Sequence, residues 1–148
     1  MQRILFVCHG NICRSPMAEF VMKDMVAKAG LSDKFYVNSV AASREEEGNF
    51  LYPPARRELE KHGVPYERKR ARLITRQDVE EYDRIYYMDS RNLRYLRQLF
   101  PGETKFRPLL FRDNMNFMLP VPLASLLAVE ICSETSAAAK ISSALDTR

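Results

Sequence analysis

A cysteine and an arginine near the start of the chain have the types and the spacing of a site that handles phosphate. Cys8 is followed after five residues by Arg14. The thiolate of a cysteine is a strong nucleophile, and the planar guanidinium of an arginine matches two phosphate oxygens in a way that lysine cannot. The next residue, Ser15, carries a hydroxyl that can donate to the Cys8 sulfur and favour its thiolate form. This spacing predicts a nucleophile and a phosphate cradle built from one turn of the chain.

The residues between Cys8 and Arg14 suit a tight loop whose backbone N–H groups converge on an anion. Gly10 and Asn11 are types that accept left-handed backbone angles, which such a loop requires. A helix that starts after the loop adds unpaired N–H donors and the positive end of its dipole. We therefore predict that phosphate binds to one continuous run, made up of His9, Gly10, Asn11, Ile12, Cys13, Arg14 and Ser15.

A buried strand and a helix must position this loop. The continuous apolar run at residues 4–7 is typical of a strand that is buried on both faces of a parallel sheet. Ser15 is expected to cap the following helix, with Pro16 in the first turn and Glu19 near the spacing of a capping box. A second strand is predicted at residues 35–40, so the chain opens with a βαβ unit that has a right-handed crossover.

The chain then continues to alternate helices and strands. Helices are predicted to begin at Pro53, Thr75 and Ser90, the last two with these residues as caps, and strands are predicted at residues 83–88 and 106–111. This order predicts an α/β protein with an open, mostly parallel, twisted sheet and helices on both faces. The phosphate-binding loop follows the first strand of that sheet.

Composition and charge exclude several classes of function. The net charge of +4 suits a small anionic ligand. The densest basic run, at residues 67–72, lacks the interleaved aromatics of a nucleic-acid surface and is predicted to be a solvated loop. The apolar runs are too short for a membrane span or a signal peptide, and three cysteines without such a signal fit a reducing cytoplasm. We expect a cytoplasmic protein with no nucleic-acid or membrane partner, no metal and no cofactor.

An ordered series of motifs over residues 4–112 resembles the bacterial type of low-molecular-weight protein tyrosine phosphatase. The series comprises Cys8 to Glu19, Ser39 with Ala41-Ala42, Glu46-Glu47-Gly48-Asn49, Tyr52-Pro53-Pro54-Ala55-Arg56, His62-Gly63, Lys69 with Ala71-Arg72, Tyr82-Asp83, Met88-Asp89 and Asn92. The resemblance implies an enzyme that hydrolyses phosphotyrosine or aryl phosphomonoesters through a cysteinyl-phosphate, without a metal. Its implied partners are a phosphotyrosine protein or an aryl phosphate, with phosphate or a similar oxyanion as ligand.

The resemblance also implies roles for single residues. Cys8 attacks phosphorus while Arg14 and the loop amides hold the equatorial oxygens. Cys13 forms a reversible disulfide with oxidised Cys8 and so protects it from irreversible oxidation. Asp89 has a structural role, with hydrogen bonds near the loop. The aromatic slot above the loop has as candidate lining residues Ile12, Phe50 and Tyr52.

The C-terminal segment departs from the family pattern. The family carries its general acid in an Asp-Pro near the C-terminus, whereas this sequence has no Asp-Pro after residue 16. Asp113 is the nearest upstream carboxylate and only a weak substitute. Loss of a general acid typically costs about 10²- to 10⁴-fold, so impaired turnover is expected. Residues 114–148 hold only five charged side chains. We interpret residues 1–148 as a single domain whose last part is either a divergent ending or the product of a shifted reading frame.

The sequence leaves two other functions open. The missing acid also fits a non-catalytic module that binds phosphate or phosphotyrosine. Such a module would bind vanadate but would not release a burst of phenol. An arsenate reductase of similar fold uses the same loop but needs further cysteines. Only Cys132 is available for that purpose, and it has no second cysteine nearby, so this alternative ranks last.

Overall fold

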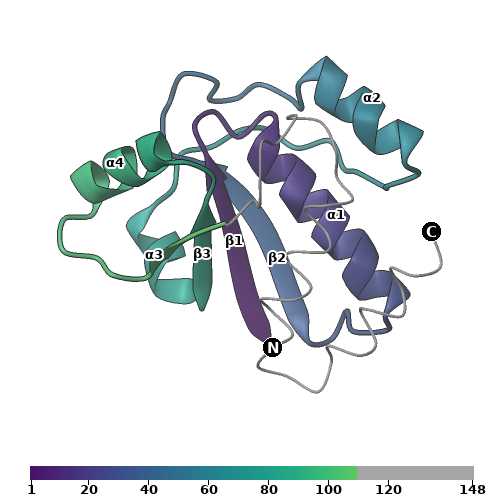
Figure 1. Cartoon of the computed structure of the whole chain (residues 1–148), viewed down its shortest axis with the longest axis horizontal. Helices are drawn as coiled ribbons and strands as arrows, with labels where there is room; N and C mark the ends of the chain where they lie inside the picture. Colours follow the sequence, from purple (N-terminus) through teal and green to yellow (C-terminus); the bar gives the residue numbers. More distant parts are fainter. Residues whose placement is uncertain (110–148) are drawn as a thin grey trace.

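The computed structural model describes residues 1–109, which form a parallel sheet with helices on both sides (Figure 1). The strands are β1 (Gln2–Cys8), β2 (Phe35–Ala41), β3 (Arg84–Tyr87) and β4 (Phe106–Pro108). Their order across the sheet is β2-β1-β3-β4, and each neighbouring pair is parallel. The predicted α/β class with an open, parallel sheet is confirmed.

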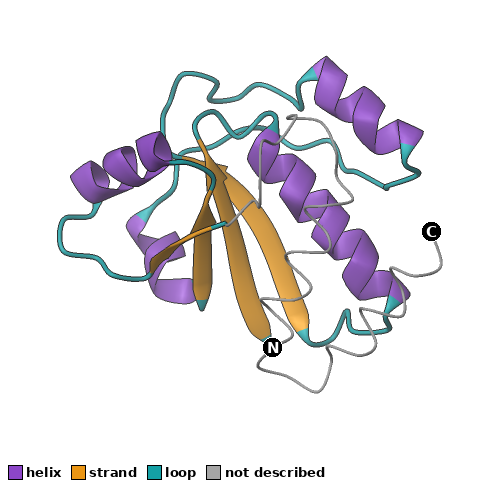
Figure 2. Ribbon diagram, in the orientation of Figure 1, coloured by secondary structure: helices purple, strands orange, loops and turns teal. Residues whose placement is uncertain are grey.

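The first strand, β1, lies inside the sheet between β2 and β3 (Figure 2). It pairs with β2 along its whole length, from Gln2 opposite Phe35 to Cys8 opposite Ala41. Residues 4–7 are fully buried, which explains a continuous apolar run where a half-exposed strand would alternate. The loop after Cys8 therefore lies at the carboxyl edge of the sheet, where open α/β proteins bind their ligands.

Within residues 1–109, the helices cover the sheet in pairs. On one face, α1 (Arg14–Lys28) and α2 (Pro53–Lys61) pack with Ile4 and Phe6 of β1. On the other face, α3 (Arg76–Glu81) and α4 (Ser90–Leu99) pack with Leu5 and Val7. Because successive side chains of a strand point to opposite faces, β1 contributes to two separate apolar cores.

The predicted cap of α1 is wrong. The helix begins at Arg14, and Cys13 occupies the cap position without a side-chain hydrogen bond. The hydroxyl of Ser15 instead bonds to groups of the loop, as described below. Glu19 belongs to no capping box, because its carboxylate is buried and accepts a hydrogen bond from Ser39 on β2.

The other predicted boundaries differ in small ways. Thr75 caps α3 as expected, whereas α4 is capped by Asp89, one residue before the predicted Ser90. The carboxylate of Asp89 reaches the N–H of Asn92 and forms a capping box with it, which the hydroxyl of Ser90 does not do. The last predicted strand begins where expected, and its predicted end lies outside the described residues, as does the whole segment from 110 onward.

The basic run at residues 67–72 is only in part a solvated loop. Arg72 donates two hydrogen bonds to Asp78 of α3, at 2.7 and 2.8 Å, and Lys69 is mostly buried. Both cations neutralise carboxylates that the fold has buried, Glu19 and Asp78. The basic run alone did not indicate these partners.

The Asp78 contacts predict how acid affects stability. Burial alone would raise the pKa of Asp78, but hydrogen bonds from Arg72 and Thr75 outweigh burial, and the pKa is lower than usual. A carboxylate with a lowered folded pKa stabilises the fold above its unfolded pKa of about 3.9, and this stability is lost as pH falls through the folded value. Asp78→Asn should be less stable at pH 7, but its stability should fall less steeply below about pH 5. Urea denaturation at a series of pH values measures this, and equal slopes in both proteins would contradict it.

Among the helices of residues 1–109, none has the length and the apolar character to cross a membrane. That part of the chain also holds no group of three or more His, Cys, Asp or Glu side chains arranged for a metal ion.

Candidate active site

The loop between β1 and α1 brings together the two residues that the sequence analysis placed at its ends. Cys8 is the last residue of β1, and Arg14 is the first residue of α1. The strand fixes the first residue in the core of the sheet, and the helix fixes the second. The loop is therefore held at both ends by regular structure.

The sulfur of Cys8 lies among hydrogen-bond donors. Its Sγ is 3.0 Å from the hydroxyl oxygen of Ser15 and accepts the backbone N–H of Asn11 at 3.3 Å. Donors of this kind stabilise a thiolate more than a thiol. Cys8 itself is almost fully buried, so few other groups compete for the sulfur.

Asn11 holds the loop in its turned conformation. Its φ is +57°, in the left-handed region as predicted, and no other residue of 1–109 except glycines has a positive φ. The side-chain amide donates to the hydroxyls of Ser15 at 2.8 Å and Ser39 at 2.9 Å. Asn11 thus ties the loop both to α1 and to β2, and its own N–H points at the Cys8 sulfur.

Gly10 is needed for close packing and not for the predicted left-handed backbone angle. Its φ is not in the left-handed region. A Cβ at this position would lie 2.9 Å from the Cγ of Glu46, so Gly10 is required for close approach between the loop and the segment that follows β2. Its neighbour His9 contacts the same segment, with Nε2 2.7 Å from a carboxylate oxygen of Glu45.

Arg14 is oriented by the N-terminal end of α4. Its Nη1 donates to Oδ2 of Asp89 at 2.6 Å, in agreement with the hydrogen bond expected near the loop. Burial alone would raise the pKa of Asp89, but the hydrogen bonds from Arg14 and from the N–H of Asn92 lower it overall. Asp89 therefore stays ionised and holds the guanidinium on one side of the loop.

The predicted slot residues differ in their contacts with the loop. Ile12 accepts the backbone N–H of Tyr52 at 2.7 Å, which joins the loop to the start of α2. The side chains of Tyr52 and Phe50 are both exposed. The ring of Phe50 is flanked by the guanidinium groups of Arg68 and Arg70, at 4.3 and 4.4 Å from its centroid.

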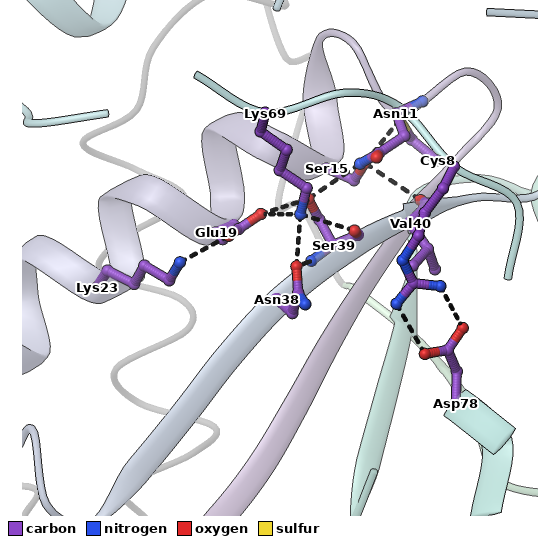
Figure 3. Close-up of polar contacts among 11 residues, drawn as sticks. Cys8, Asn11, Ser15, Glu19, Lys23, Asn38, Ser39, Val40, Lys69 and Asp78 are labelled. Carbon is purple, nitrogen blue, oxygen red and sulfur yellow. Dashed lines mark hydrogen bonds and ion pairs between the residues drawn. The ribbon is translucent and has the colours of Figure 1, made fainter. Parts of the chain in front are cut away.

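The sequence analysis named Ser39 only as part of the family resemblance and gave it no role in the site. It is fully buried on β2, and its hydroxyl contacts Asn11 and Glu19 (Figure 3). Its partners lie 20 and 28 residues away in the sequence, so local spacing could not assign them. The weak candidate for the general acid, Asp113, and the remaining cysteine, Cys132, lie outside the described residues.

Cys13 differs from Cys8 in its expected reactivity. Burial raises the pKa of the Cys13 thiol, Cys8 raises it further, and Arg14 opposes this effect. We therefore expect iodoacetamide to label Cys13 slowly at neutral pH and faster as the pH is raised. In Cys8→Ser, labelling of Cys13 should begin at a lower pH, because one of the two causes is gone. Peptide mass mapping after timed labelling measures this, and an unchanged pH profile in the variant would count against it.

The parallel sheet and the loop after β1 define a class of α/β protein, and comparison with known proteins specifies the family. The family model described as "Low molecular weight phosphotyrosine protein phosphatase" matches residues 3–116. The chain belongs to this family. The match agrees with the resemblance seen in the sequence.

Individual relatives support the assignment. "Low molecular weight phosphotyrosine protein phosphatase 2" of Drosophila melanogaster is 39% identical over 107 residues, which are 72% of this chain and 65% of the relative. "Low molecular weight protein-tyrosine-phosphatase YfkJ" of Bacillus subtilis (strain 168) is 37% identical over 99 residues, 67% of this chain and 64% of the relative. The matched part thus spans just under two thirds of the length of these curated relatives.

Solved structures show the same fold. The crystal structure of YfkJ from Bacillus subtilis has a TM-score of 0.71 at 30% identity, covering 99% of this chain and 96% of that one. The crystal structure of SP-PTP, a low molecular weight protein tyrosine phosphatase from Streptococcus pyogenes, has a TM-score of 0.70 at 29% identity, covering 99% and 90%.

Proposed function

We propose that this chain is a protein tyrosine phosphatase that hydrolyses phosphotyrosine or other aryl phosphomonoesters through a cysteinyl-phosphate. The observation that carries the proposal is the Cys8 sulfur, which lies 3.0 Å from the Ser15 hydroxyl and accepts the N–H of Asn11, in a loop that ends at Arg14. The names of the relatives, which are phosphotyrosine protein phosphatases, support the substrate class.

In the first chemical step, the Cys8 thiolate attacks phosphorus in line with the leaving aryl oxygen. The S–P bond forms, the P–O bond to the aryl group breaks, and that electron pair leaves on the aryl oxygen. Arg14 and the backbone N–H groups of residues 9–15 hold the three equatorial oxygens as their charge is redistributed. Phosphate contacts are thus assigned to His9, Gly10, Asn11, Ile12, Cys13, Arg14 and Ser15.

In the second step, water attacks phosphorus and the S–P bond breaks. The sulfur leaves as a thiolate, and the Ser15 hydroxyl beside it stabilises that leaving charge by a hydrogen bond. Inorganic phosphate is the product. This chemistry requires a free thiol at Cys8, so we also propose a reducing compartment, the cytoplasm, as the location of the protein.

Burst kinetics with p-nitrophenyl phosphate test the proposal. We expect a rapid release of p-nitrophenol equivalent to the enzyme, followed by slower turnover limited by hydrolysis of the intermediate. Acid quenching during the burst should leave a phosphate on the peptide that contains Cys8, detected by mass spectrometry. Cys13→Ser is the matched control: it removes a thiol but keeps the backbone N–H through which residue 13 is assigned to phosphate, so it should retain the burst. Binding of vanadate without any burst would instead establish the non-catalytic binding module.

The leaving group should affect turnover strongly. Because the sequence has no Asp-Pro to supply a proton, we expect poor leaving groups to react much more slowly than activated ones. The value of kcat/KM for phosphotyrosine should fall below that for p-nitrophenyl phosphate by about 10²-fold or more, the usual contribution of a general acid. Steady-state assays with both substrates decide this. Equal values for the two substrates would show that another group donates the proton.

A further inference from the structure

The ammonium group of Lys69 binds the buried polar residues behind the catalytic loop (Figure 3). Lys69 comes from the segment between α2 and α3, and 50 residues separate it from Glu19 in the sequence. Its Nζ donates to Oε2 of Glu19 at 2.6 Å, to the carbonyl oxygen of Ser39 at 2.8 Å and to the Ser39 hydroxyl at 3.0 Å. It also donates to the side-chain oxygen of Asn38.

A chain of hydrogen bonds links these contacts to the sulfur of Cys8. The hydroxyl of Ser39 donates to Glu19 at 2.5 Å and accepts the side-chain amide of Asn11 at 2.9 Å. Asn11 in turn donates its backbone N–H to Cys8. Glu19, Ser39 and Asn11 are 2%, 0% and 3% exposed, so water does not compete for these bonds.

The position of the Ser39 hydroxyl depends on Lys69. A hydroxyl has one proton and two acceptor lone pairs, and here the proton goes to Glu19 while Asn11 and Lys69 occupy the acceptor sites. Burial lowers the pKa of Lys69, and the charge of Glu19 opposes that effect. The hydrogen bonds from Nζ to Oε2 of Glu19 and to the Ser39 hydroxyl hold both side chains in one geometry.

Lys23 provides a comparison within the same cluster. It donates to the other carboxylate oxygen of Glu19, Oε1, at 2.7 Å, so it also neutralises the buried charge. Its ammonium group contacts this carboxylate and the ring of Phe20, and not the Ser39 hydroxyl that Lys69 reaches. Replacing each lysine in turn therefore tests neutralisation of Glu19 separately from orientation of Ser39.

We infer that Lys69 is a positioning residue for the catalytic loop: it orients the Ser39 hydroxyl, which orients Asn11 and hence the N–H that Asn11 donates to Cys8. This inference rests on the proposed function. Lys69 touches neither the substrate nor the reacting atoms, and it acts through two intervening side chains.

The test compares Lys69→Met with Lys23→Met as the matched control. We expect Lys69→Met to lower kcat for p-nitrophenyl phosphate by about 10- to 100-fold, since small displacements of catalytic groups have effects of this size, and Lys23→Met to lower it by less than about threefold. Lys69→Arg keeps the charge and several donors, and it should recover at least part of the lost rate. Equal losses in the two methionine variants would overturn the inference.

A second measurement does not depend on turnover. The rate of alkylation of Cys8 by iodoacetate, and its protection by inorganic phosphate, report on the loop even if the wild-type protein hydrolyses nothing. We expect Lys69→Met to slow this alkylation by about tenfold and to weaken the protection, with little change in Lys23→Met. Unchanged alkylation and protection in Lys69→Met would overturn the inference whatever the fate of the proposed function.

A double variant distinguishes loss of stability from loss of positioning. Lys69→Met combined with Glu19→Gln removes both buried charges, so it should recover thermal stability relative to Lys69→Met alone. Ser39 still lacks the ammonium group, so kcat should stay low. Recovery of kcat together with stability would show that Lys69 has only a structural role.

Discussion

Replacing Cys8 by serine is expected to lower the hydrolysis of p-nitrophenyl phosphate by a factor of more than about 10⁴, because the nucleophile itself is lost. A serine hydroxyl ionises far less readily than a thiol, and the donors around the sulfur, Ser15 and Asn11, do not change that difference. Steady-state assays and the phosphopeptide trap described above measure the loss. Full activity in this variant would refute the proposed mechanism.

The control for this variant is phosphate binding. Cys8→Ser keeps Arg14 and the loop N–H groups, so inorganic phosphate should still bind and still raise the thermal unfolding temperature. Loss of both binding and turnover would mean that the loop had collapsed, and the variant would then say nothing about the nucleophile. Cys8→Ala provides an independent substitution for that case.

Replacing Arg14 by lysine is expected to cause the second large loss of activity. Lysine keeps the positive charge but loses the planar pair of donors, and a transition-state arginine is worth about 10³-fold or more in phosphoryl transfer. We expect kcat/KM for p-nitrophenyl phosphate to fall by about 10³-fold. Vanadate inhibition should weaken in parallel, since vanadate occupies the same oxygen positions.

Arg56→Lys is the matched control for Arg14→Lys. Arg56 lies on the exposed side of α2, where its guanidinium is 3.8 Å from Glu60. The same chemical change there should leave kcat/KM within about twofold of the wild-type value, since an exposed ion pair contributes little. If Arg14→Lys lost less than tenfold in activity, the clamp assigned to Arg14 would be wrong.

The elements that position the loop could be predicted because their signals are local. A run of four apolar residues before Cys8 indicated a buried strand, and Thr75 indicated a helix start. The spacing from Cys8 to Arg14 was enough to place a loop at the end of that strand. Asn11 was expected to adopt a left-handed angle, and it does.

The polar residues behind the loop could not be predicted in the same way. Glu19 looked like a residue of the first helical turn, and Lys69 like one of several solvated cations. Their actual partners come from β2 and from a segment 50 residues away, and only the fold brings these together. For Ser15 the predicted contact with the Cys8 sulfur forms and the predicted cap does not, and local spacing does not reveal that the Asn11 amide also donates to its hydroxyl.

The position of Cys8 at the end of β1 has a consequence for how the protein loses activity. The strand that carries the nucleophile is the inner one of β2-β1-β3, with both faces in apolar cores. Amide hydrogens of such a strand exchange with solvent only through global opening, whereas loops and termini exchange through local fluctuations. The position of Cys8 should therefore persist during denaturation until the native state itself is lost.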